Sequence, residues 1–160
     1  MIQVETLRNY VADALTEDQL QMFRLADSAG CNGFEFTRVA QGDQNQNFTL
    51  EHIRARLLRT GKQVGSEYCV WADEWAINVI ANKLGITMLI FDEQAKGNKF
   101  LVMPPIGISD SNLSSSSRKV MMLQRTRREH FNLIQFDGQG LVSLGSLPQT
   151  IRQNWFNPVR

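Results

Sequence analysis

Residues 73–91 read DEWAINVIANKLGITMLIF, and this stretch decides the fold of the chain. Its first part repeats apolar residues at helical spacing, which predicts a core helix. Those residues are Ile77, Ile80, Ala81 and Leu84. Asp73 is suited to cap this helix, and Gly85 is suited to the left-handed residue that follows a helix end. The apolar run 86–91 then predicts a central strand that the chain enters directly from the helix.

Three further helices are predicted upstream, because apolar stripes begin at Val4, after Thr16 and at Leu50. Thr16 and Gln19 have the spacing of a capping box, which marks the start of the second of these helices. Residues 40–47 contain no core-forming side chain and predict a surface loop.

Strands dominate the second half of the chain. They are predicted at 99–103, 119–123, 130–136 and 141–144. The serine-rich residues 109–117 predict a mobile loop, and Asp137-Gly138 predicts a turn. Ser146 and Gln149 form another capping-box pattern, which predicts a short last helix. Helices followed by strands indicate an α+β fold, with helices packed on a small, mostly antiparallel sheet.

Composition indicates one globular domain over 1–160, since 42% of the 160 residues are hydrophobic and 21% are charged. The net charge of +1 gives little attraction to nucleic acid or to a membrane surface. Cys31 and Cys69 are the only cysteines, and we find no signal peptide and no apolar run that could span a bilayer. These features predict a reducing, cytoplasmic setting.

His130 is the most informative single residue, in the run Arg128-Glu129-His130-Phe131-Asn132. Residues two apart on a strand share a face, so the His130 imidazole and the Asn132 carboxamide are expected side by side. A histidine general base is oriented in this way in nucleophilic hydrolases. The alternative is a half-exposed strand end with ordinary polar residues.

The order of these features resembles the ovarian-tumour (OTU) family of cysteine deubiquitinases. The matching pieces are Leu7–Val11, Trp71 before the core helix, Leu84-Gly85 with the strand 86–93, Val120–Leu123 and Glu129–Asn132. The resemblance covers about residues 7–134 and leaves 135–160 as a C-terminal extension. It implies an OTU-like cysteine protease fold, His130 as general base, Asn132 as its orienter, and ubiquitin or a ubiquitin-like protein as partner.

The family's nucleophile lies in an Asp-Gly-x-Cys element before the segment that matches Leu7–Val11, and this chain starts directly before that segment. Cys31 is the nearest candidate nucleophile, but its aspartate, Asp27, is four residues back and it follows the first matching helix. Two functions remain open: a peptidase seen without its nucleophile block, and a non-catalytic binding or scaffold subunit of a larger assembly. Either way, we expect this chain to show no turnover.

Two further groups of side chains, tryptophans and arginines, have alternative structural and binding roles. Trp71 and Trp75 are expected as core anchors, with a binding role for Trp71 as the alternative. Arg125, Arg127 and Arg128 form a basic cluster that is either a solvated turn or a contact for a carboxylate-bearing partner. An RNA partner for this cluster is a weaker alternative.

The cysteines and histidines lack the paired spacing of zinc ligands, so no metal and no cofactor are expected.

Overall fold

The stretch that decides the fold forms a helix and a strand joined by a tight turn. Helix α5 spans Glu74–Leu84, and strand β1 spans Thr87–Asp92. Between them Gly85 has a φ of 63° and donates its N–H to the carbonyl of Asn82, while the next N–H donates to Ala81. These two hydrogen bonds form a Schellman motif, which ends a helix through a residue in the left-handed region. The predicted role of Gly85 is confirmed.

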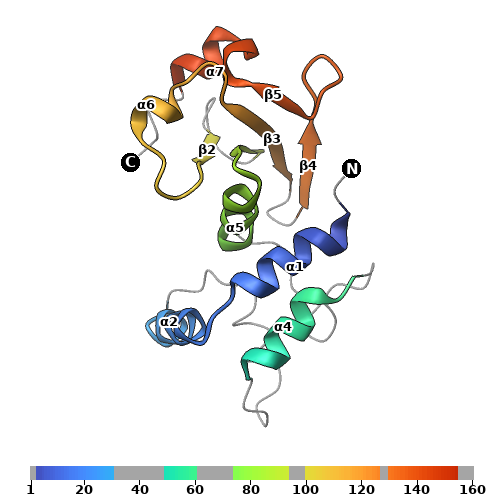
Figure 1. Cartoon of the computed structure of the whole chain (residues 1–160), viewed down its shortest axis with the longest axis vertical. Coiled ribbons are helices and arrows are strands. Elements are labelled where there is room, and N and C mark those ends of the chain that lie inside the picture. Colours follow the sequence, from blue (N-terminus) through green and yellow to red (C-terminus); the bar gives the residue numbers. More distant parts are fainter. Residues whose placement is uncertain (1–2, 31–48, 61–73, 94–99, 127–129, 155–160) are drawn as a thin grey trace. The chain divides into compact units, whose positions relative to one another are not determined.

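The computed structural model describes residues 3–30, 49–60, 74–93, 100–126 and 130–154 (Figure 1). They group into two compact units, Met1–Ile80 and Ala81–Arg160, with the boundary inside α5. Asp73 and the loop predicted at 40–47 lie outside the described residues.

The first unit contains α1 (Val4–Ala14), α2 (Glu17–Ser28), α4 (Leu50–Leu58) and the start of α5. Its core comes mostly from the predicted apolar stripes, although Ala12, Ala76 and Val79 were not predicted and Val4, where the first stripe was expected to begin, is exposed. The buried members are Val11, Ala12, Leu15, Leu20, Phe23, Ile53, Leu57, Ala76 and Val79. The ring of Trp75 packs against this core and meets Phe23 edge to face, with centroids 5.5 Å apart. Trp75 is therefore confirmed as a core residue.

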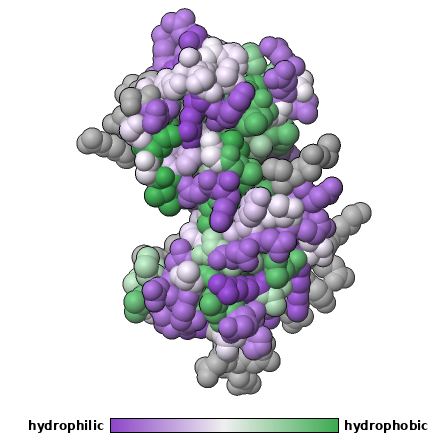
Figure 2. Space-filling view, in the orientation of Figure 1, coloured by the Kyte–Doolittle hydropathy of each residue, from purple (hydrophilic) through white to green (hydrophobic). Residues whose placement is uncertain are grey.

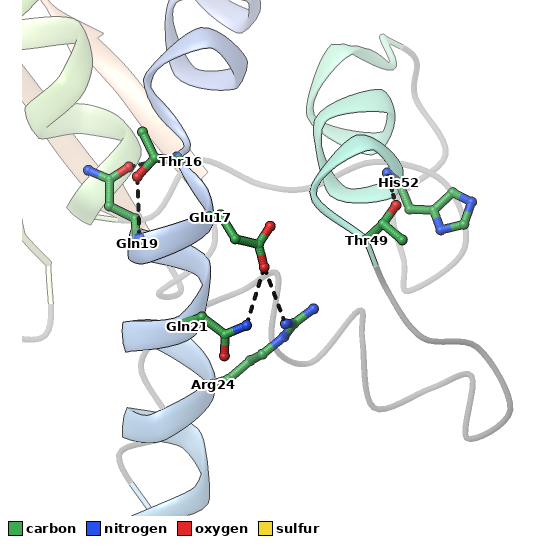
Figure 3. A network of polar contacts seen from close by, with 7 residues as sticks. All are labelled: Thr16, Glu17, Gln19, Gln21, Arg24, Thr49 and His52. Carbon is green, nitrogen blue, oxygen red and sulfur yellow. Dashed lines mark hydrogen bonds and ion pairs between the residues drawn. The ribbon is translucent and has the colours of Figure 1, made fainter.

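Side-chain caps start α2 and α4 (Figure 3). The Thr16 N–H donates to Gln19 Oε1 at 3.0 Å, and the Gln19 N–H donates to Thr16 Oγ1 at 3.3 Å. This reciprocal pair confirms the predicted capping box. At α4, Thr49 Oγ1 accepts the His52 N–H at 3.4 Å.

Two arginines connect α1 with α4 at their C-terminal ends. Arg8 donates to the Leu57 carbonyl at 2.8 Å, and Arg54 donates to the Leu15 carbonyl at 3.2 and 2.7 Å. Carbonyls at helix C-termini lack partners within the helix, so a cation from a neighbouring helix stabilises them. An arginine of each helix therefore stabilises the C-terminal end of the other helix.

The second unit is built on a five-stranded sheet with the order β2-β1-β3-β4, and β5 also pairs with β3. The strands besides β1 are β2 (Phe100–Met103), β3 (Lys119–Thr126), β4 (His130–Ile134) and β5 (Leu141–Ser143). β1 and β3 are parallel, and the other three pairs are antiparallel. The predicted α+β class is confirmed, and β1 lies inside the sheet as expected. The sheet is mixed, and its parallel pair β1–β3 was not predicted.

One face of this sheet carries the second core. Its buried members are Leu89, Val120, Met122, Val142, Leu144 and Leu147. Leu113 of α6 (Asp110–Leu113) and Ile151 of α7 (Gln149–Asn154) pack against it. Short helices from the second half of the chain therefore cover this face.

β4 and β5 follow the same side of β3 in succession. Ile134 pairs with Met122, and Leu141 pairs with the adjacent Met121. The residues between them turn back at Asp137-Gly138, whose φ values of 50° and 73° fit a type I′ hairpin turn. The turn predicted there is confirmed.

Three local predictions are corrected. Residues 109–117 are not only a loop, because Ser109 accepts the Asn112 N–H and starts α6. Ser146 caps no helix: its hydroxyl donates to the Ser143 carbonyl within the 3-10 turn η1 (Leu144–Ser146). β4 ends at Ile134, because the chain leaves β3 for the hairpin.

Candidate functional site

The candidate site lies where β3 ends and β4 begins. Thr126 pairs with His130, and Gln124 pairs with Asn132. Positions two apart on paired strands belong to the same face, so these four positions share one face of the sheet. Asn132 and Gln124 are exposed and Thr126 is half-buried. The side chain of His130 lies outside the described part of the structure, so its contact with Asn132 stays a prediction.

This polar group of positions continues the face that carries the second core. Ile134, two residues after Asn132, packs against that core, as do Phe91 and Phe100. The two phenylalanine rings lie 5.1 Å apart on the paired strands β1 and β2, of which β1 is the neighbour of β3. The face is therefore apolar along most of its length and polar at the end where β4 begins. A few solvent-exposed polar groups beside an apolar surface are typical of binding and catalytic sites.

An ion pair lies at the same end of the sheet on the opposite face. Arg125 donates from Nε and Nη2 to Asp92 Oδ2, at 3.2 and 2.5 Å. The carbonyl of Arg125 also accepts the Glu93 N–H at 3.1 Å. Arg125 pairs with Phe131 of β4, directly between the His130 and Asn132 positions. Arg125 therefore belongs to a strand and not to a turn.

The other end of β3 has a different arginine. Arg118 Nε donates to Thr87 Oγ1 at 3.0 Å, and Thr87 is fully buried. Arg118 Nη2 is buried without a hydrogen-bond partner in the described structure, and burial lowers the pKa of this guanidinium. Arginine stays charged even so, and this contact joins β1 to the start of β3.

Several predicted site residues lie outside the described part of the chain. They are Cys31, Cys69, Trp71, Arg127 and Arg128. Their predicted roles, including Cys31 as nucleophile and Trp71, Arg127 and Arg128 as binding residues, stay predictions.

The described ranges contain no group of three or more His, Cys, Asp or Glu side chains that could hold a metal ion. In the same ranges, no helix combines the length and apolar character needed to cross a bilayer. No family model matches the chain, and neither a curated protein nor a solved structure matches it.

Sequence reasoning missed Gln124 and Thr126, which the register adds to the candidate site. The signal that could have found them is the alternation after Met122, since Gln124 and Thr126 continue its side of the strand. Nothing local indicates that Arg125 meets Asp92, because the two residues are 33 positions apart.

Proposed function

We propose that this chain carries an OTU-like, ubiquitin-directed cysteine peptidase fold, with His130 as general base and Asn132 as its orienter. The observation that carries the proposal is the register of β3 and β4, which places His130 and Asn132 at positions on the same face, at the end of the sheet where β4 begins. The order α5, Schellman turn and central β1 supports it, because the resemblance to the family rests on the same order.

The chemistry needs a thiol that this pair can activate. The imidazole takes the proton of the thiol, and the thiolate attacks the carbonyl carbon of the ubiquitin C-terminal amide. The C–N bond then breaks, the imidazolium gives its proton to the leaving amine, and a thioester remains. Water, deprotonated by the imidazole, hydrolyses the thioester to the ubiquitin carboxylate and the free thiol. A carboxamide next to the imidazole holds the ring and its tautomer in the productive orientation. Histidine and asparagine without a thiolate cannot form the covalent intermediate. The thiol comes either from an Asp-Gly-x-Cys element placed before Leu7 or from Cys31.

A ubiquitin-derived electrophilic probe separates these two sources. We expect no labelling of the chain as printed, and the Cys31→Ser variant serves as the matched control. Labelling that disappears in Cys31→Ser would make Cys31 the nucleophile and correct the proposal on this point.

Restoring the cysteine element tests the catalytic roles. With an Asp-Gly-x-Cys helix joined before residue 1, we expect cleavage of ubiquitin chains. His130→Ala should nearly abolish turnover, whereas Asn132→Ala should only weaken it, since the first change removes the base and the second its orientation. Gln139→Ala, an exposed change in the hairpin, is the control for handling and folding. Turnover that persists in His130→Ala would rule out the proposed role of His130.

A non-catalytic OTU-like binding or scaffold subunit is the second candidate. It is favoured by exposed leucines on the sheet face opposite Asn132. They are Leu101, Leu133 and Leu141, with 43–48% of each residue accessible. Apolar side chains reach the visible surface over the sheet in Figure 2. Binding of mono-ubiquitin, mapped by NMR of side chains, discriminates the two. Shifts of the Asn132 and Gln124 amide groups favour the peptidase, and shifts confined to the leucine methyl groups of the opposite face favour the scaffold.

A further inference from the structure

We propose that the Asp92–Arg125 ion pair is a positioning pair that fixes the end of β3 and thereby the backbone of His130. The catalytic purpose of this positioning rests on the proposed function. The position of His130 itself can be measured without any turnover.

The contacts converge on one residue of β3. Arg125 is held through its side chain by Asp92 and through its carbonyl oxygen by the Glu93 N–H. Both contacts come from the last residues of β1 or the position just after it. A guanidinium that donates twice to one carboxylate is oriented more strictly than a single hydrogen bond allows. The end of β3 is therefore tied to β1 by its backbone and by its side chain.

This restraint passes to β4 through the sheet. Arg125 pairs with Phe131, and the next residue of β3, Thr126, pairs with His130. Thr126 and His130 are the last residue of β3 and the first residue of β4. Strand ends fray when they are held by backbone pairing alone. The ion pair of Arg125 lies one residue before this end, where a side-chain contact opposes fraying of the strand pair at His130.

The partial burial of the pair fits positioning better than bulk stabilisation. The side chains of Arg125 and Asp92 are 30% and 23% exposed. An ion pair with this much contact with water contributes little to global stability, because solvent screens the attraction. Its directional hydrogen bonds still select one arrangement of the strand end. Loss of the pair should therefore change the local geometry more than the melting midpoint.

Proton NMR of the histidine rings measures this directly. The chain has only two histidines, and His52 lies in α4 of the other unit, so its signal is an internal reference. His52→Gln assigns the two signals. All spectra are recorded at one fixed pH, so that variants are compared under the same conditions.

We expect Asp92→Asn and Arg125→Gln to move or broaden the His130 signal more than the His52 signal. The charge-swapped double variant Asp92→Arg with Arg125→Asp should return the His130 signal toward its original position. Arg125→Lys, which keeps the charge but not the double donation, should give an intermediate change and covers the case that Arg125→Gln folds poorly.

Thr87→Val is the matched control, because it removes the other arginine contact between β1 and β3, at the opposite end of the sheet. It should leave the His130 signal in place. An unmoved His130 signal in both single variants, or an equal change in Thr87→Val, would overturn the positioning role. In the enzyme with a restored cysteine, Asp92→Asn should lower kcat with KM unchanged. Turnover that does not depend on His130 would remove the proposed function while leaving the NMR result standing.

Discussion

The two ends of the sheet use the same kind of contact for different purposes. At the start of β3, Arg118 meets the fully buried Thr87 beside the apolar core. At its end, Arg125 meets Asp92 in contact with water, next to the exposed Gln124 and Asn132 positions. Both arginines join β3 to β1. At the start of β3, loss of a hydrogen-bond partner would lower the stability of the fold, because the partner is buried, and we call this the closed end of the sheet. At the end of β3, side chains stay accessible to a ligand, and we call this the open end.

The largest expected effect is the difference in stability loss between a substitution in the apolar core of the sheet and one at its open end. Leu89 is fully buried in the core that covers β1 and β3, so Leu89→Ala should lower the free energy of unfolding by about 2–5 kcal/mol. Asn132→Ala should change it by no more than about 0.5 kcal/mol, because Asn132 is exposed. Urea unfolding of both variants measures this. A similar loss in both would mean that the open end belongs to the structural core.

A smaller effect compares the two arginine contacts. Thr87→Val keeps the shape of the side chain but leaves Arg118 Nε without its acceptor, so we expect a loss of about 1–3 kcal/mol. Asp92→Asn keeps a hydrogen-bond acceptor in a partly exposed place and should cost less than about 1 kcal/mol. Thermal melts at matched pH compare them. A larger loss in Asp92→Asn than in Thr87→Val would reverse the assignment of the two ends.

The smallest effect concerns the entry into β1 at the closed end. Gly85→Ala places a side chain at a φ of 63°, where nothing lies within 4 Å of the added Cβ, so only backbone strain is introduced. This strain should lower stability by about 1 kcal/mol. Gly138→Ala, at a φ of 73° and equally open, gives the same strain in the exposed hairpin after β4 and serves as the comparison. An unchanged melting midpoint for Gly85→Ala would show that the helix end tolerates another geometry.

Predictions from sequence succeeded where the signal lies within a few residues. The end of α5 at Gly85, the capping box at Thr16 and the turn at Asp137-Gly138 were all predicted and are present. Predictions from local pattern failed where one side chain has two possible partners close by in the sequence. Ser146 has the pattern of a cap, but its hydroxyl is used by the Ser143 carbonyl. A local pattern specifies which bonds a side chain can make, and packing selects among them.

For the candidate site, the local sequence pattern was enough to relate His130 and Asn132 as residues two apart on one strand. Strand periodicity is a local property, so two residues of β4 could be related without knowledge of its neighbours. The same locality explains why α5 and β1 could be predicted almost to the residue.

The neighbours of those two residues follow from the assembled sheet and could not be read from the local pattern. Gln124 and Thr126 join them through the antiparallel register of β3 and β4. Asp92 reaches Arg125 because β1 and β3 run parallel, although 33 residues separate the two side chains in the chain. Strand register depends on which apolar faces pack together and on hydrogen bonds between distant segments, and these energies exist only once the sheet has formed.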